Sequence, residues 1–369
     1  MSTSSTIPAM DHHKPAKRHR YTSTKHEVCE QVKHKDVLRI LGEWYVHNAR
    51  ALPWRDPTTS AWGVLVSEVM SQQTPMNRVE PIWRNWMASW PTAHSLAAAS
   101  PSKIIVAWAN LGYPRRALRL HECAKVVSDE YLGNVPQTFE ELIGLPGIGE
   151  YTANAVLCFA WGKRVCVLDT NIRRVLLRVF DGIDQPPRSM NSAEKHRHIS
   201  RLPIDLVDSI VWNKAMMEFG ALVCTAQKPA CSICPLARHC VFQQSGAHVH
   251  GRHVKKQTWV GTDRQARGRI MRLLRELHEQ QRYCLSVERA LCEARLTKPP
   301  AASGGQARSN AGSGEHKHAK AASDATGTCA HHTDANFDNT RAKRVLKSLI
   351  DDGLIVYCDS EQTSVRLPE

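Results

Sequence analysis

The sequence predicts a mainly α-helical protein with a small mixed module at its C-terminal end. Apolar residues recur with a period of about 3.6 in a dense series of short segments between residues 28 and 220. Almost no segment in that range alternates apolar and polar residues, as a half-buried strand would. After residue 338, by contrast, one helical pattern precedes two short β-prone runs around a polar turn, at residues 354–358 and 363–367.

The composition narrows the class of protein. The 369 residues are enough for two or three domains, and 42% of them are hydrophobic. The formal net charge of +14 favours a polyanionic partner, although a solvated basic surface without a partner is the alternative. No apolar run approaches the roughly 18 residues of a membrane span, and the basic N-terminal residues lack the apolar core of a secretory signal. Only four of the 12 cysteines cluster, which is unlike a secreted disulfide scaffold, so a cytoplasmic location is expected.

The first two thirds of the chain divide into a tail and a run of helices. Residues 1–27 are polar, basic and rich in His, and we expect them to be disordered. An amphipathic helix is expected from Val28 to Val46, and the prolines at positions 53 and 57 separate it from the next helix. Gly or Pro punctuation then divides most of the further predicted helices, at residues 61–71, 75–90, 94–99, 101–110, 114–131, 137–143, 150–161, 169–180 and 203–220.

The last third contains a linker and an interrupted module. Residues 246–262 are basic and rich in His, as a linker would be. Residues 299–337 consist largely of Ala, Gly, Ser, Lys and His without periodicity, so we expect a disordered insertion. Helices are predicted on both sides of it, at residues 264–281, 285–296 and 339–352. Together with the final hairpin they predict a small winged-helix-like module over residues 263–369.

Four cysteines form the strongest metal-binding pattern, with the spacing C-x6-C-x2-C-x5-C: Cys224, Cys231, Cys234 and Cys240. Four thiolates this close along the chain can surround one metal centre, and a [4Fe–4S] cluster is the favoured occupant. Zinc is the alternative, but structural zinc sites usually pair two short knuckles and only one C-x2-C is present. Lys228, Arg238 and His239 beside these cysteines suggest a basic loop that faces phosphate.

A glycine-punctuated turn, Leu145-Pro146-Gly147-Ile148-Gly149, precedes the helix predicted to begin at about residue 150. Glycines allow main-chain amides to approach an anion closely, and a helix N-terminus adds the positive end of its dipole. Gly147 and Gly149 therefore predict a site for a DNA phosphate that does not read sequence. An ordinary turn between two helices is the alternative.

Two carboxylates stand out by their surroundings. Asp169 follows the β-branched segment 165–168 and precedes a helical run, so it could cap that helix or place a charge beside a substrate. Glu68 lies in a mostly apolar helical segment, where a lone Glu is usually solvent-exposed.

Taken together, these residues resemble the helix-hairpin-helix base-excision DNA glycosylases that carry an iron–sulfur cluster. The resemblance covers about residues 28–260 and is nearest to the adenine DNA glycosylases of the MutY type. The matching segments are Leu52-Pro53-Trp54-Arg55, Ser67-Glu68-Val69-Met70, Gln72-Gln73-Thr74, Leu111-Gly112-Tyr113 and Ala221-Leu222-Val223-Cys224. The resemblance implies a six-helix barrel domain with the helix-hairpin-helix over residues 58–164. It also implies an iron–sulfur cluster domain formed by residues 28–57 and 165–245.

The resemblance implies a monofunctional glycosylase that flips adenine out of a mispair with 8-oxoguanine or guanine and hydrolyses it, leaving an abasic site. Glu68 would be the general acid that protonates the base, and Asp169 would stabilise or briefly capture the cationic sugar. Tyr151 would orient this pair. Bifunctional relatives carry a lysine at this position, and without that amine the Schiff-base route to strand cleavage lacks its nucleophile.

The remaining site residues are assigned by resemblance to two groups. The expected adenine pocket consists of Arg50, Leu52, Trp54, Arg55 and Glu218, although Trp54 could equally belong to the core. Gln73 and Tyr113 match positions that wedge into the base stack beside the mispair. The expected partner is double-stranded DNA with a mispaired adenine, bound by a monomer.

The chain departs from the family pattern in three places. Pro114 stands where many members have a second tyrosine, and Thr170 where many have glycine. Residues 260–369 do not resemble the Nudix-like β-domain with which longer members read 8-oxoguanine, so that preference would rest on the catalytic domain. Two alternatives stay open: a glycosylase for another base, such as thymine opposite guanine or an oxidised pyrimidine, and a non-catalytic DNA-binding module.

Overall fold

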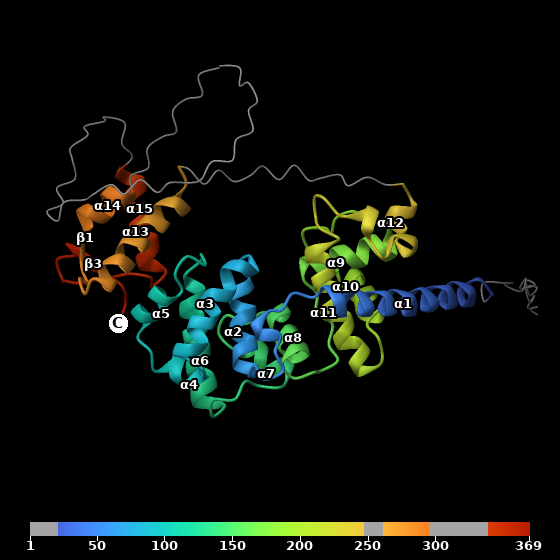
Figure 1. Ribbon diagram of the computed structural model, residues 1–369. Coiled ribbons are helices and arrows are strands. Elements are labelled where there is room, and N and C mark those ends of the chain that lie inside the picture. Colours follow the sequence, from blue (N-terminus) through green and yellow to red (C-terminus); the bar gives the residue numbers. More distant parts are fainter. Residues whose placement is uncertain (1–20, 247–260, 295–338) are drawn as a thin grey trace, which may run out of the picture. The chain divides into compact units, whose positions relative to one another are not determined.

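The computed structural model describes residues 21–246, 261–294 and 339–369, with side chains from residue 34 onward (Figure 1). The chain forms two compact units. Unit 1 comprises Met1–Arg50 and Lys163–Gly251, and unit 2 comprises Ala51–Gly162 and Arg252–Glu369. Within the described ranges no helix is long and apolar enough to cross a lipid bilayer.

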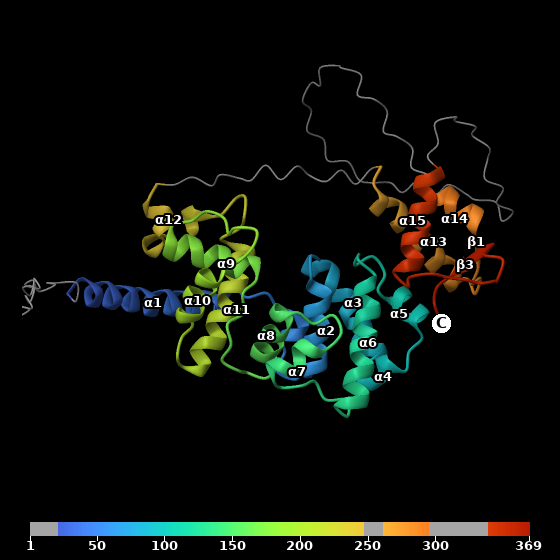
Figure 2. The ribbon, with the colours of Figure 1, turned by 180° about the vertical axis from the view of Figure 1, so that it is seen from behind.

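Unit 1 is built from helices and short helical turns around α11. The long helices α1 and α11 pack together, and α11 also packs against α9 (Figure 2). Val37 and Leu41 of α1 and Trp212 and Phe219 of α11 are almost fully buried, which makes this contact the apolar core of the unit. The helical elements of unit 1 are α1 (Tyr21–Asn48), α9 (Thr170–Leu176), the π-helical turn η2 (Leu177–Asp181), α10 (Ser192–Ser200), α11 (Leu206–Leu222), η3 (Cys231–Ile233), η4 (Ala237–His239) and α12 (Val241–Gln244).

The first part of unit 2 is a bundle of short helices around α2 (Ala61–Ser71). Every residue of α2 from Trp62 to Met70 is buried, and α2 packs against α3, α6 and α8. A mostly apolar helix that is buried on all sides belongs in the interior, and α2 is accordingly the central helix of this part. The elements around it are η1 (Pro53–Arg55), α3 (Met76–Ser89), α4 (Ala93–Ala97), α5 (Pro101–Ala107), α6 (Arg115–Glu130), α7 (Phe139–Gly144) and α8 (Glu150–Phe159).

The C-terminal module of unit 2 alternates helices with a small antiparallel sheet. Its order is α13 (Asp263–Glu279), β1 (Leu285–Ser286), α14 (Val287–Ala294), α15 (Asn339–Asp351), β2 (Val356–Tyr357) and β3 (Ser364–Arg366). Strand β3 lies between β1 and β2, with Leu285 opposite Val365 and Val356 opposite Arg366. This order of helices and strands fits the winged-helix-like module expected from the sequence, an assignment that stays a prediction.

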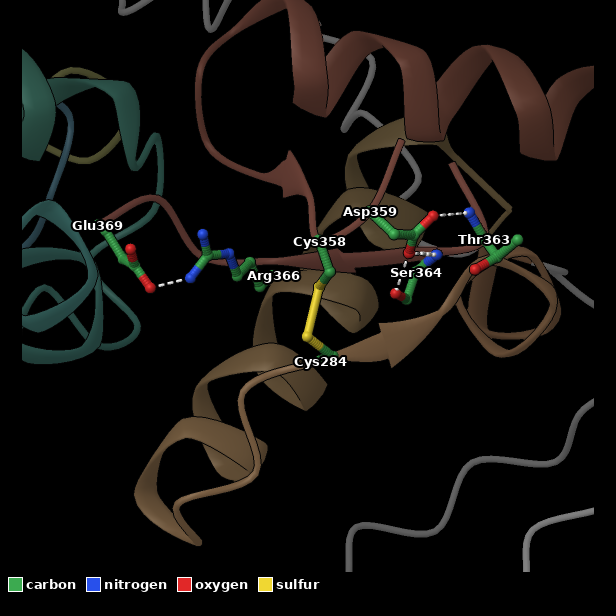
Figure 3. Close-up of a disulfide and its surroundings, with 7 residues drawn as sticks. All are labelled: Cys284, Cys358, Asp359, Thr363, Ser364, Arg366 and Glu369. Atoms are coloured by element: carbon green, nitrogen blue, oxygen red, sulfur yellow. Dashed lines mark hydrogen bonds and ion pairs between the residues drawn. A yellow bond between two sulfur atoms is a disulfide. The ribbon is translucent and has the colours of Figure 1, made fainter. Parts of the chain in front are cut away.

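A disulfide joins Cys284, just before β1, to Cys358, just after β2, and so ties together the two edge strands of the sheet (Figure 3). Beyond it, Asp359 accepts hydrogen bonds from the main-chain amides of Thr363 (2.8 Å) and Ser364 (3.0 Å), which shapes the turn before β3. The sequence did not predict this disulfide, because nothing in the pattern pairs two cysteines 74 residues apart.

Most predicted helices are present, with bounds shifted by a few residues. Helix α1 begins at Tyr21, inside the tail expected to be disordered. The helix predicted at residues 169–180 changes to a π-helical turn at Leu177. Helix α10 was not predicted, because the side chains it buries, Glu194 and His198, are polar. Residues 1–20, 247–260 of the predicted linker and the predicted insertion at residues 299–337 lie outside the described residues.

Candidate active site

Glu68 is a buried carboxylate on the central helix of unit 2. Only 8% of its surface is exposed, and it lies in the unbroken run of buried residues from Trp62 to Met70. The hydroxyl of Tyr151 donates a hydrogen bond of 3.0 Å to Oε2 of Glu68. The expectation that Glu68 is solvent-exposed is therefore wrong. A buried carboxyl group needs a polar partner, and Tyr151 provides one.

Tyr151 lies in the first turn of α8, directly after the hairpin Leu145–Gly149. Gly147 has a φ of 79°, and a Cβ there would lie 3.0 Å from Cβ of Arg119, so the position requires glycine. Gly149 is the N-cap residue of α8, makes no side-chain cap, and has open space where a Cβ would be. The helix start also carries the positive end of the helix dipole, and a phosphate site there stays a prediction.

Asp169 lies in unit 1 as the N-cap residue of α9. Its Oδ1 accepts a 2.6 Å hydrogen bond from the amide of Ile172, and its Oδ2 accepts one of 2.9 Å from the side chain of Asn171. Burial raises the pKa of the Asp169 carboxyl above its ordinary value, while these hydrogen bonds oppose the rise. The capping role is therefore present. A catalytic partnership with Glu68 of unit 2 stays a prediction.

Arg50 and Glu218 of the expected adenine pocket are bound to each other in unit 1. The Arg50 guanidinium donates from Nε to Oε1 (2.7 Å) and from Nη2 to Oε2 (2.8 Å), and its main-chain amide donates to Oε1 at 3.0 Å. Glu218 is fully buried on α11, and its hydrogen bonds raise the pKa of Arg50. This bidentate pair ties the chain after α1 to α11. A role in base binding stays a prediction for both residues.

The other expected pocket residues lie at η1 in unit 2. Leu52 and Trp54 are each only 8% exposed, and Arg55 is partly exposed. The Trp54 ring meets the ring of Trp83 edge-on at 5.6 Å, and the Trp83 indole donates to the carbonyl of Gly63 on α2. Trp54 thus has the packing of a core residue beside the central helix, and a pocket role for it stays a prediction.

Gln73 and Tyr113, the expected wedge residues, both have left-handed backbone conformations. Their φ angles are 55° and 47°, and both side chains are exposed. A positive φ is uncommon for residues other than glycine and needs support from the surrounding structure. Both residues lie on loops that adjoin the same groove of unit 2.

Arg116 supplies that support, although no residue pattern in the sequence pointed to it. Its guanidinium donates to the carbonyls of Val69 (2.9 Å) and Gln72 (2.6 Å) at the end of α2, and to that of Gly112 (3.1 Å) before Tyr113. Burial lowers the pKa of Arg116 to about 10. One partly buried cation thus holds both wedge loops and the helix that carries Glu68. Hydrogen bonds to main-chain carbonyls leave no sequence signal, so only the structure could identify it.

The four cysteines of the predicted metal site line one cavity in unit 1, together with apolar side chains and Arg178. Arg178 of η2 donates to Sγ of Cys224 at 3.5 Å and to the carbonyl of Thr225 at 2.7 Å. Arg174 of α9 donates to the carbonyls of Cys224 (2.9 Å) and Gly220 (2.6 Å). Two arginines that the sequence did not single out therefore connect the helix capped by Asp169 to the cysteine loop.

The donor set of this cavity fits a cluster with cysteine ligands. Burial raises the pKa of Cys234 to about 12, so the thiol would keep its proton unless a cation displaced it. Within the described residues no three His, Cys, Asp or Glu side chains are arranged to hold a single metal ion as they stand. Four thiols around one largely apolar cavity suit an iron–sulfur cluster, and their role as its ligands stays a prediction. The neighbouring Lys228 and Arg238 are exposed, and their phosphate contacts stay a prediction.

Comparison with known families agrees with this geometry. Residues 66–198 match the HhH-GPD superfamily of base excision DNA repair proteins. Residues 224–240, from the first to the last of the four cysteines, match the iron–sulfur binding domain of endonuclease III. The predicted superfamily is confirmed, and an iron–sulfur group is indicated in place of zinc.

Solved structures agree on the fold. A thermostable thymine-DNA glycosylase aligns with a TM-score of 0.53 and 26% identity, over 58% of this chain and 99% of that one. Endonuclease III in a non-covalent DNA complex aligns with a TM-score of 0.50 and 23% identity, over 59% of this chain and 97% of that one, which shows a common fold. The predicted mainly helical, helix-hairpin-helix glycosylase fold is confirmed.

Relatives of known name lie closer in sequence. The adenine DNA glycosylase of Mycolicibacterium smegmatis is 48% identical over 233 residues, which cover 63% of this chain and 78% of that protein. The one of Mycobacterium tuberculosis is 45% identical over 63% of this chain and 76% of that protein. The human one is 40% identical over 54% of this chain and 38% of that protein. With this identity over most of a relative's length, the chain belongs to the adenine DNA glycosylase family of helix-hairpin-helix base-excision repair proteins.

Proposed function

We propose that this protein is a monofunctional DNA glycosylase that removes adenine mispaired with 8-oxoguanine or guanine and leaves an abasic site. The observation that carries the proposal is the buried carboxyl of Glu68, held by Tyr151 within a DNA glycosylase fold. Membership of the adenine DNA glycosylase family supports adenine as the base.

Release of adenine requires a proton donor beside the nucleobase. Adenine is a poor leaving group until a ring nitrogen is protonated, and Glu68 would donate that proton. Tyr151 donates to Oε2 of Glu68, and this bond would help to orient the carboxyl group toward the departing base.

Release of adenine also requires a negative charge beside the deoxyribose. Loss of the base leaves an oxocarbenium-like sugar, and Asp169 would stabilise or briefly capture it before water attacks. The donors Ile172 and Asn171 hold the carboxylate in one orientation. A nearby cationic sugar favours the ionised carboxylate and so counteracts the effect of burial on Asp169.

The side chain at position 151 bears on strand cleavage. A tyrosine hydroxyl that donates to a carboxylate cannot form the Schiff base with the sugar that a lysine amine would form. The protein would therefore release the base without cutting the DNA strand. Treatment with borohydride during turnover checks this, because a covalent protein–DNA adduct in high yield would contradict a monofunctional mechanism.

The remaining residues would hold the DNA and the flipped base. Gln73 and Tyr113, exposed on strained loops, would enter the base stack, and Gly147 and Gly149 would receive a phosphate at the start of α8. The residues proposed to enclose the flipped adenine are Arg50, Leu52, Trp54, Arg55 and Glu218.

We further propose that Cys224, Cys231, Cys234 and Cys240 hold a [4Fe–4S] cluster, which their spacing and common cavity support. When bound, the cluster would act as a structural cross-link that stiffens the basic loop around it. We also propose that the enzyme acts as a monomer in the cytoplasm.

A panel of duplexes tests the base specificity. The purified protein is incubated under single-turnover conditions with duplexes that carry adenine opposite 8-oxoguanine, adenine opposite guanine, adenine opposite thymine, or thymine opposite guanine. Alkali then cleaves any abasic strand. We expect cleavage of the adenine strand of the two mispairs and none of the paired duplex. Release of thymine alone would favour the alternative glycosylase, and no release from any of these duplexes would leave a glycosylase for an oxidised pyrimidine or a non-catalytic DNA-binding module.

A further inference from the structure

A wide groove in unit 2 separates the loop before α6 from helix α13. Its volume is about 1180 Å³, and one wall is formed by residues 106–115. The other wall presents five arginines of α13, here called the arginine ridge: Arg264, Arg267, Arg269, Arg272 and Arg275. With two more arginines on the opposite side, seven arginines face three acidic residues along the groove. The groove is thus electropositive and open to a polyanion.

Several contacts fix α13 against the rest of unit 2. Ile105 of α5 is fully buried in the apolar core of the C-terminal module. Arg275 donates to the carbonyl of Ala109, and Arg115 of α6 and Arg267 of the ridge both pair with Asp352. Three of the cations around the groove therefore have structural roles that keep it in shape. Arg264 and Arg272 are exposed, and Arg272 pairs with Glu276 one turn further along α13 at 3.9 Å.

The groove contains both expected wedge residues. Gln73 and Tyr113 line it, and the guanidinium of Arg264 lies 5.0 Å from the centre of the Tyr113 ring. The guanidinium of Arg116 lies 5.7 Å from the centre of the same ring. A residue proposed to enter the base stack is thus placed directly beside the N-terminal end of the arginine ridge.

We infer that the arginine ridge of α13 binds the phosphodiester backbone of the duplex beside the mispair. The inference rests on the proposed function, because it takes the DNA at Gln73 and Tyr113 as its starting point. DNA that contacts these residues must pass next to Arg264, and arginine forms strong charge-assisted hydrogen bonds with phosphate oxygens. The C-terminal module would thereby lengthen the DNA-binding surface without reading sequence.

Another basic surface of the module provides a matched control. Helix α15 exposes Lys343 and Lys347, and neither lines the groove. Replacing these two lysines by glutamine removes the same charge from the same module as replacing Arg264 and Arg272 by glutamine. All four side chains are exposed, so neither change should disturb folding, which the thermal midpoint checks.

The test measures the equilibrium Kd for a mispaired and a fully paired duplex across a salt series, and the rate of base release at saturating protein. We expect Arg264→Gln/Arg272→Gln to raise the Kd for both duplexes about tenfold and to lower the salt slope by about 2. The saturated rate of base release should stay within about twofold, and Lys343→Gln/Lys347→Gln should change neither quantity.

Three results would overturn the inference: an unchanged Kd in the arginine variant, an equal loss in the lysine variant, or a loss confined to the saturated rate. The first result would leave the groove for a different partner, such as an acidic protein segment. A failure of this inference can be distinguished from a failure of the proposed function. A protein that binds duplexes through the ridge but releases no adenine would fail the duplex panel and still support the ridge.

Discussion

Tyr151 Oη lies 3.0 Å from Oε2 of Glu68 and donates a hydrogen bond to it across 83 residues of sequence. The bond connects the central helix α2 to the first turn of α8, directly after the glycine hairpin. The element proposed to hold a DNA phosphate therefore also carries the residue that orients the proposed acid. Phosphate binding and acid positioning thus depend on one short segment of chain.

Replacing Tyr151 by Phe tests this orientation. The change removes the hydroxyl and keeps the ring, so α8 should stay in place. Loss of a hydrogen bond to a carboxyl group costs about 1.4 kcal/mol, which corresponds to about a tenfold slower base release under single-turnover conditions. Duplex affinity serves as the control and should change little. An unaltered rate would mean that Glu68 is oriented by other contacts.

Replacing Glu68 by Gln tests the acid itself. The amide keeps the size of the side chain and an acceptor for Tyr151, but it cannot donate an acidic proton to adenine. We expect base release to fall at least ~10²-fold while duplex binding is retained. Glu80→Gln on the surface of α3 is the matched control and should be neutral. Activity equal to the parent protein would remove Glu68 from the mechanism.

Asp169→Asn separates chemistry from stability. Asparagine caps helices about as well as aspartate, so the bond to Ile172 should persist while base release falls by at least ~10²-fold. Because the folded protein raises the pKa of Asp169, the native state holds this proton more tightly than the unfolded chain. Protonated Asp169 therefore stabilises the fold fully at pH values below its pKa in the unfolded chain. This stabilisation is lost as the pH rises through its pKa in the folded protein.

At neutral pH the buried, ionised carboxylate of Asp169 therefore lowers the free energy of unfolding. A neutral asparagine does not have this effect. We expect the thermal midpoint of Asp169→Asn to equal or exceed that of the parent protein at pH 7. The difference should shrink as pH falls toward the ordinary aspartate pKa of about 4. A clearly lower midpoint at pH 7 would mean that the carboxylate stabilises the helix start more than burial penalises it.

The sequence predicted those parts of the fold and site that leave a residue pattern. Apolar periodicity located α2 and most other helices, the spacing pointed to the four cysteines, and the family resemblance pointed to Glu68 and Tyr151. Helix α10 escaped because its inward side chains, Glu194 and His198, are polar, with Glu194 also bound by Arg173 at 2.8 Å. Apolar periodicity cannot reveal a helix that is anchored by a buried ion pair.

The sequence did not reveal the supporting arginines for a different reason. Arg116 and Arg178 act mainly on main-chain carbonyls, and every residue type presents the same carbonyl group. Several of their partners lie far away in sequence, 44 residues for the bond from Arg116 to Gln72 and 47 for the bond from Arg178 to Thr225. Such contacts follow from the fold and cannot be inferred from the spacing of residue types.

Arg116→Gln should loosen both wedge loops. The shorter neutral side chain cannot reach the carbonyls of Val69, Gln72 and Gly112 together, and unsatisfied buried acceptors cost about 1–3 kcal/mol. We expect a lower thermal midpoint and a weaker preference for mispaired over paired duplex. Arg119→Gln, one turn away and half-exposed, is the control for loss of a charge on α6. A stable variant with unchanged preference would show that the loops hold their conformation without this cation.

Arg178→Ala should weaken the cluster site without removing a ligand. Its guanidinium contacts Sγ of Cys224 and the carbonyls of Thr225 and Ala226, so its loss leaves the loop that carries the first cysteine without these anchors. Contacts around metal ligands are worth about 10- to 100-fold in metal affinity. We expect faster loss of iron and of visible absorption on incubation with a chelator, with Arg238→Ala, exposed beside the cysteines, as the control. Equal rates in the parent and Arg178→Ala would mean that the four cysteines hold the cluster without help from η2.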